Sequence, residues 1–189
     1  LSGLYLAVGT GLSYVSAYFG TPFFALAAAS TWILGLILIK RENPSFWLSL
    51  AFALVGLVTG LVRPEGVILA ALMLLAVIVM RGLKNSISII VIFGVVFAIL
   101  GGAYFLWRWD YFGYPLPNPF YKKGDSGWKW DSFQHSMQNA LRLCLPMVFA
   151  FIYGFRSNET TKRTLAYLIP ILGFATAFGM ISDEMNYGA

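Results

Sequence analysis

The sequence predicts an all-α protein, a polytopic bundle of about six to seven transmembrane helices with an interfacial helix and an outer loop rich in proline and aromatic residues. Hydrophobic residues make up 59% of the 189 positions and charged residues only 11%. The mean hydropathy of +0.74 lies well beyond that of an ordinary soluble domain. Apolar runs of the length that a helix needs to cross a bilayer recur along the chain, with short polar breaks between them. We therefore expect one transmembrane domain over residues 1–189, with the lipid bilayer as a partner. A soluble nucleic-acid binder, which a pI near 9.4 would allow, is excluded by the same runs.

The apolar runs define the predicted spans in chain order. They cover residues 2–19, 22–39, 46–62, 66–80, 87–107, 140–155 and 165–181. Serine, tyrosine and glycine residues dilute the first run, which either crosses the membrane or only dips into it. The spacing of Gly56 and Gly60 is a small-xxx-small pattern, which predicts close helix packing.

The polar breaks alternate between two sides of the membrane if each run from residue 22 onward crosses once. The breaks at 63–65 and 108–135 and the terminal stretch then share one side, and those at 40–43, 81–85 and 156–163 share the other. The second group holds seven basic residues and two acids, and the first holds six basic residues, with Arg142 just beyond the long break counted in, and six acids. The positive-inside rule thus predicts that the 63–65 break faces outward.

Arg63 and Glu65 flank Pro64 in the predicted hairpin between two spans. Proline fits the first turn of a helix, where its missing N–H costs nothing. Ionisable groups at the membrane are expensive, so this pair is a candidate for a functional site. The alternative is that both side chains only cap a loop and meet lipid headgroups.

The long outer segment carries the second group of candidate residues. Its three prolines, at 115, 117 and 119, predict an extended backbone that needs water or protein around it. Lys122 and Lys123 follow, and with Arg63 or Arg108 they can hold a phosphate at the interface. Snorkelling lysines and an aromatic belt of tryptophans are the alternative.

A helix is expected after this segment, capped by Asp131 or Ser132 and lying along the interface. One face of it is apolar, with Phe133, Met137, Ala140 and Leu141. Asp183 stands at the last outer helix end, where it can bind a sugar hydroxyl or lie in a solvated loop. The sequence has no HExxH, no cysteine cluster, no phosphate-binding glycine loop and no GxSxG, so we expect neither a metal site nor a cofactor.

Two motifs in order give the chain a family resemblance. "LVRPEGVILA", followed about fifty residues later by "YFGYPLPNPFYKK", resembles the bacterial polytopic glycosyltransferases of the GT-C superfamily, which carry an RPEG hairpin and then a Y-[FY]-G-x-x-L-P-N-T-x-Y-x-K segment. "YFGTPFFAL" and the closing "SDEMNYGA" are similar to two further family segments. Where the family has Glu before Thr-Pro this chain has Gly20, and Pro119 replaces the threonine of P-N-T.

The resemblance implies sugar transfer from a polyprenyl-phosphate donor to a glycan, lipid or protein acceptor, at the outer face of the inner (plasma) membrane. The positions that would bind the donor phosphate are Arg63, Arg108, Lys122 and Lys123, and those that would orient groups or bind the sugar are Glu65, Asn118, Tyr121 and Asp183. The family's catalytic aspartate lies in a first outer loop, which we expect upstream of Leu1. The chain is thus expected to be an internal fragment without its own general base.

Two other functions fit parts of the pattern. In a transporter or flippase fragment, Arg63, Glu65 and Asp183 would line a substrate path. In a structural or assembly subunit, the charges would serve only topology. A transporter predicts charges within spans and paired broken helices, whereas here the charges lie at span ends and no repeat is visible. The structural alternative leaves the order of the outer motifs unexplained.

Overall fold

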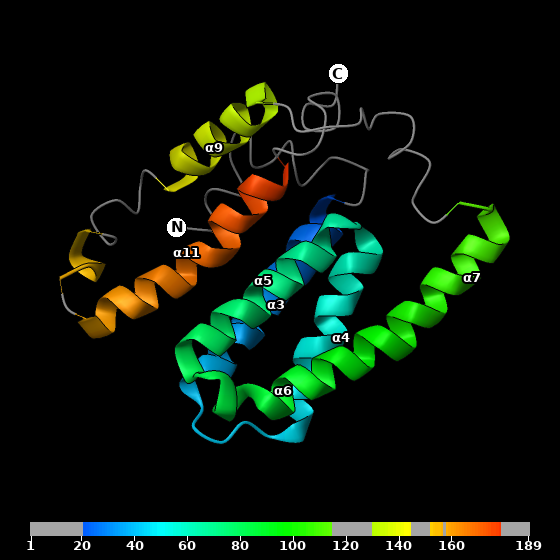
Figure 1. Ribbon diagram of the computed structural model, residues 1–189, viewed down its shortest axis with the longest axis horizontal. Coiled ribbons are helices and arrows are strands. Elements are labelled where there is room, and N and C mark those ends of the chain that lie inside the picture. Colours follow the sequence, from blue (N-terminus) through cyan, green and yellow to red (C-terminus); the bar gives the residue numbers. More distant parts are fainter. Residues whose placement is uncertain (1–20, 115–129, 145–151, 157, 179–189) are drawn as a thin grey trace.

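The computed structural model describes residues 21–114, 130–144, 152–156 and 158–178, and every regular element within these ranges is a helix (Figure 1). The elements are α3 (Thr21–Lys40), α4 (Phe46–Val62), α5 (Glu65–Arg81), α6 (Leu83–Val96), the π-helical segment η1 (Phe97–Gly101), α7 (Gly102–Phe112), α9 (Trp130–Cys144) and α11 (Asn158–Phe178). The prediction of an all-α fold is confirmed for this part of the chain.

Two of the described helices are long and apolar enough to cross a membrane by length and composition. They are Pro22–Lys40 and the continuous helix Leu83–Phe112, of 19 and 30 residues. Helix α4 is apolar but shorter, with 17 residues. The predicted run at 2–19 lies outside the described residues, and the count of six to seven spans stays a prediction.

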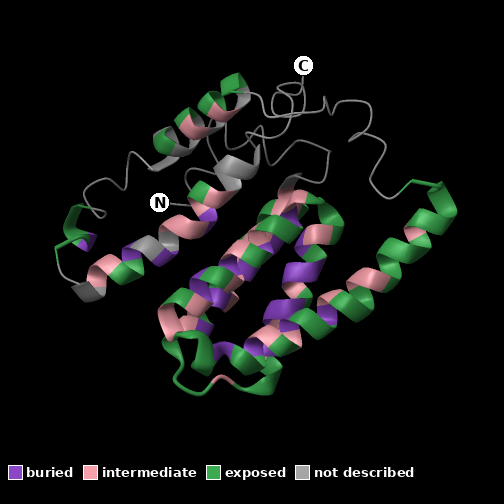
Figure 2. Ribbon diagram, in the orientation of Figure 1, coloured by how far each residue is buried: buried purple, intermediate pink, exposed green. Residues whose placement is uncertain are grey.

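Helices α3, α4 and α5 pack side by side, α6 packs against α4, and α11 covers α5. The layer between them consists of apolar side chains, among them Phe52, Met73 and Ile89. Buried residues concentrate on the facing sides of these helices, whereas α7 has none (Figure 2).

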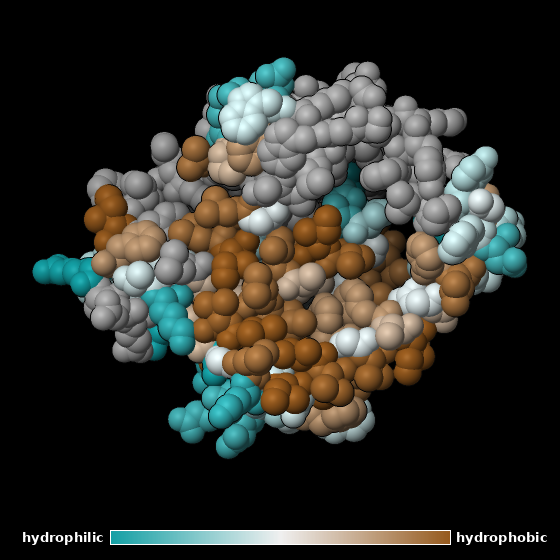
Figure 3. All heavy atoms as spheres, in the orientation of Figure 1, coloured by the Kyte–Doolittle hydropathy of each residue, from teal (hydrophilic) through white to brown (hydrophobic). Residues whose placement is uncertain are grey.

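The outer surface of α6 is as apolar as its inner face. Ile87, Val91 and Val95 are each about half exposed. Figure 3 shows a continuous hydrophobic surface over this part of the bundle. A helix that is apolar all round is stable when lipid or further protein covers it, so this surface fits a membrane environment.

Helices α4 and α5 approach each other closely where the hairpin joins them. A Cβ atom on Gly66 would collide with the backbone carbonyl of Thr59, and one on Gly60 would collide with Val67. At the same level the hydroxyls of Thr31 and Thr59 share a buried hydrogen bond of 2.9 Å between α3 and α4. Small residues and paired hydroxyls are the means by which helices pack tightly in an apolar solvent.

At the opposite end of the bundle, Arg81 connects the end of α5 with the end of α3 and the residues that follow it. Its guanidinium donates hydrogen bonds to the carbonyls of Leu38 and Glu42, both at 2.8 Å, and to the carbonyl of Arg41. A cation suits this position because carbonyls at a helix C-terminus carry partial negative charge. The arginine therefore holds the end of α3 against the end of α5.

Two predicted breaks are shorter than the sequence suggested. Arg108 and Trp109 belong to α7 rather than to an extended loop, because no proline occurs between Leu83 and Tyr114 to end the helix. The helix ends at Gly113, whose φ of 71° suits glycine and whose N–H donates to the Trp109 carbonyl. The break expected at 81–85 consists of Gly82 alone, with a φ of 82°.

The structure describes the predicted span at 140–155 only at 140–144, in α9, and at 152–156, so this span stays a prediction. Helix α9 begins at Trp130, with the expected caps Asp131 and Ser132 in its first turn, and it continues to Cys144. Phe133 and Met137 are half-buried on it and His135 is exposed, which fits the predicted face, whereas Leu141, expected on the same face, is exposed. Residues 152–154 are helical and residues 155–156 form a turn, and α11 begins at Asn158, inside the break expected at 156–163.

We predict that Gly66→Ala destabilises the bundle by about 1–3 kcal/mol, because the added methyl group meets the Thr59 carbonyl, which belongs to the rigid backbone of α4. Thermal unfolding in detergent, followed by circular dichroism, measures the effect. Gly94→Ala is the matched control, since a Cβ at Gly94 has no neighbour within 4 Å. The control should be neutral or stabilising. Equal unfolding temperatures for the two variants would contradict the close approach.

Candidate functional site

The hairpin between α4 and α5 follows from the residues Arg63, Pro64 and Gly66. A residue before proline is pushed out of the helical region, and Arg63 accordingly adopts φ −144° and ψ 131°, which ends α4. Pro64 is helical and opens α5. The N–H of Gly66 donates to the Arg63 carbonyl at 2.8 Å, so the turn closes within two residues.

Arg63 and Glu65 form an ion pair on this hairpin. Arg63 Nε lies 3.4 Å from Glu65 Oε1, and the two side chains are 45% and 21% exposed. The Arg63 guanidinium also lies over the ring of Phe24, 5.6 Å from its centroid. Glu65 is the one acidic residue in the first turn of α5, where the helix dipole favours a carboxylate. A guanidinium has five donors, so Arg63 retains the capacity to bind a second anion.

A groove of about 520 Å³ opens beside the hairpin. Its walls come from α4, the start of α5, η1 and α7, and they are apolar except for one arginine and one tyrosine. The lining residues are Leu57, Gly60, Leu61, Pro64, Val67, Phe97, Gly101, Tyr104, Phe105 and Arg108. This volume falls in the range typical of ligand pockets.

The groove forms where the long helix leaves the bundle. Phe97 and Gly101 bound the π-helical segment η1, and π-turns within α-helices occur frequently at functional sites. Beyond this segment α7 diverges from α4 and α5 (Figure 1). Gly101 allows the end of η1 to lie close to α4, because a Cβ at this position would lie 3.2 Å from Leu57 Cδ1.

Arg108 is the cation of this groove. It is half-buried on α7, whereas its neighbours Trp107 and Trp109 are exposed. Its guanidinium lies over the ring of Phe112, 5.8 Å from the centroid. Arg108 and Pro64 line the same groove, and Pro64 directly follows Arg63. The arrangement suits an amphiphile with a long apolar chain and an anionic head.

The structure describes three of the predicted site residues. Arg63 and Glu65 pair with each other, and Arg108 lines the groove beside their hairpin. The remaining predicted residues lie outside the described part of the chain: Asn118, Tyr121, Lys122, Lys123 and Asp183.

The apolar half of the site was not predicted. The charged residues predicted a site at the hairpin, whereas Phe97, Tyr104 and Phe105 were predicted only as parts of a span. The available signals were the small residues: Gly60 belongs to the small-xxx-small pattern, and Gly101 and Gly102 interrupt the long apolar run.

Comparison with protein-family models, with curated proteins and with solved structures finds no match to this chain.

We predict that Glu65→Gln changes the free energy of unfolding by less than about 1 kcal/mol, because an ion pair with an arginine that is 45% exposed contributes little. The thermal unfolding assay used for Gly66→Ala measures it. A loss as large as that of Gly66→Ala would mean that the ion pair, rather than the close backbone contact, holds the hairpin.

Proposed function

We propose that this chain is part of a membrane glycosyltransferase of GT-C type, built as a bundle of six to seven spans in the inner membrane. It transfers a sugar from a polyprenyl-phosphate donor to an acceptor hydroxyl at the outer face. The observation that carries the proposal is the apolar groove bordered by Arg108 and by the Arg63 hairpin.

The groove supports a polyprenyl donor because its two kinds of surface match the two halves of such a lipid. Apolar walls such as Leu61, Val67 and Phe105 would exclude water from an isoprenoid chain, at about 25 cal/mol for each Å² buried. Arginine is the side chain best suited to a phosphate, because its planar fork of N–H groups matches two phosphate oxygens. Arg108 provides one such fork in the lining of the groove, and Arg63, which is not part of the lining, provides a second on the adjoining hairpin.

The proposed reaction breaks the bond between the anomeric carbon and the phosphate oxygen. The acceptor oxygen attacks that carbon from the opposite face, so the configuration inverts, and a carboxylate takes the acceptor's proton. That general base is proposed to lie upstream of Leu1. Negative charge gathers on the departing lipid phosphate, and fixed cations at Arg63, Arg108, Lys122 and Lys123 would lower the barrier.

The other predicted residues have supporting parts in this scheme. Glu65 lies within ion-pair distance of Arg63 and would orient its guanidinium. Asn118, Tyr121 and Asp183 are proposed to contact the sugar. The acceptor is a glycan, lipid or protein hydroxyl.

We predict that Arg63→Gln and Arg108→Gln each weaken binding of a polyprenyl-phosphate sugar to the full-length protein roughly tenfold or more, since each removes charge-assisted hydrogen bonds to phosphate. Binding and turnover are measured on purified protein in nanodiscs. Arg156→Gln, at an exposed position away from the groove, should leave both unchanged. A donor with a short prenyl chain should bind more weakly than one with a long chain, because it fills less of the groove.

Unchanged donor binding in both variants, or no binding of any polyprenyl-phosphate sugar, would contradict the proposal. Movement of the lipid between leaflets without sugar transfer would instead favour a flippase.

A further inference from the structure

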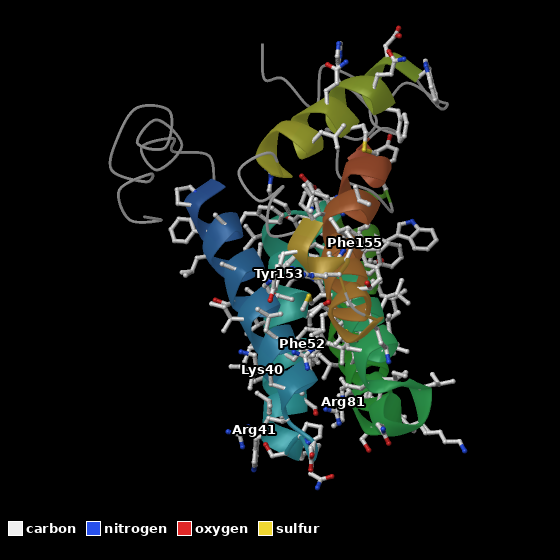
Figure 4. The ribbon with its side chains drawn as sticks, turned by 90° about the vertical axis from the view of Figure 1, so that its left-hand side faces the viewer. Lys40, Arg41, Phe52, Arg81, Tyr153 and Phe155 are labelled. Carbon is white, nitrogen blue, oxygen red and sulfur yellow. The ribbon has the colours of Figure 1, made fainter. Side chains whose placement is uncertain are left out.

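The end of the bundle opposite the hairpin carries a cluster of cations. Lys40, Arg41 and Lys84 are exposed there and Arg81 is half-buried. Within 40–45 and 81–85 the only acidic residue is Glu42. Figure 4 shows Lys40, Arg41 and Arg81 toward the same end of the helices.

Arg81 belongs to this cluster, but its guanidinium is hydrogen-bonded to backbone carbonyls. One guanidinium donates to carbonyls at both segments: Leu38, Arg41 and Glu42 on one, and Asn85 on the other at 3.4 Å. Arg81 therefore connects the end of α3 with the start of α6, the segment to which Lys84 belongs. By contrast, the side chains of Lys40, Arg41 and Lys84 have no hydrogen bond or salt bridge with any residue that the structure describes.

Exposed hydrophobic side chains lie along the edge of this cluster. Trp47 is 74% exposed, Leu83 64% and Phe46 58%. Tryptophan is enriched at the headgroup level of membranes because its ring is apolar and its N–H is polar. Unpaired cations next to exposed apolar side chains form a surface for a ligand that is itself charged at one end and apolar at the other.

We propose that this surface, Lys40, Arg41 and Lys84 with the adjoining Trp47 and Leu83, binds the headgroup of an anionic phospholipid. The ammonium and guanidinium groups contact the phosphate, and the acyl chains lie on the exposed apolar face of α6. The inference requires that the chain spans a membrane, as the proposed function does, but it does not require sugar transfer. It places a second lipid site at the end of the bundle away from Arg63.

Native mass spectrometry of the full-length protein in detergent measures the dissociation constants for phosphatidylglycerol and phosphatidylcholine. We expect a preference for phosphatidylglycerol that falls roughly 25-fold in the double variant Lys40→Gln, Lys84→Gln, since each basic residue near anionic lipid strengthens binding about fivefold. The variant Lys40→Arg, Lys84→Arg keeps both charges and should keep the preference. The variant Arg156→Gln, Lys162→Gln removes two exposed charges elsewhere and should also keep it.

Equal losses in the two glutamine variants would mean diffuse attraction by net charge and would overturn the site, as would no loss in either. A preference removed by Arg63→Gln but not by Lys40→Gln, Lys84→Gln would assign the lipid to the donor groove and overturn the proposal. Loss of donor turnover leaves this measurement untouched, so the two proposals fail separately.

Discussion

The contact between the Thr59 carbonyl and Gly66 is the constraint on which the rest of the structure depends. It allows α4 and α5 to join through only two residues, and so it fixes where Arg63 and Glu65 stand. The same approach holds Thr59 where its hydroxyl meets Thr31, which brings α3 against the pair. The three-helix core and one wall of the groove are then determined together. A larger residue at position 66 would disturb all of them at once.

The two ends of the bundle use arginine in opposite ways. At one end Arg81 donates from Nη1 and Nη2 to backbone carbonyls, and so it holds the end of α3 against the end of α5. At the other end Arg63 contacts one carboxylate and one aromatic ring and keeps donors available. The difference lies in the partners and not in the residue type. Charge counts along the sequence therefore cannot separate a structural arginine from a binding one.

Much of the core could be predicted because its breaks carry strong local signals. The runs at 22–39, 46–62 and 66–80 match α3, α4 and α5 to within two residues, since Pro64 and the polar residues after Lys40 interrupt a nearly continuous apolar sequence. The close packing predicted at Gly56 is also present, with a Cβ there 3.1 Å from that of Ala70.

The candidate site could be predicted only in part. Of its predicted residues, the structure describes Arg63, Glu65 and Arg108. The groove could not be predicted, because it depends on η1, a shift in backbone hydrogen bonding that composition does not reveal, and on the divergence of α7. The end of this helix was predicted at residue 107 and lies at Phe112, because the tryptophans and charged residues around 108 resemble a loop.

The length of the helix Leu83–Phe112 has a consequence for how the groove sits in a bilayer. Its 30 residues extend about 45 Å, against a hydrocarbon core of about 30 Å. In the proposed membrane protein the helix must tilt, or its last turns must emerge among the headgroups. Arg108 lies in those last turns, so the depth of its guanidinium follows the thickness of the membrane. A thicker bilayer would draw that charge toward the hydrocarbon, and a thinner one would leave it in water.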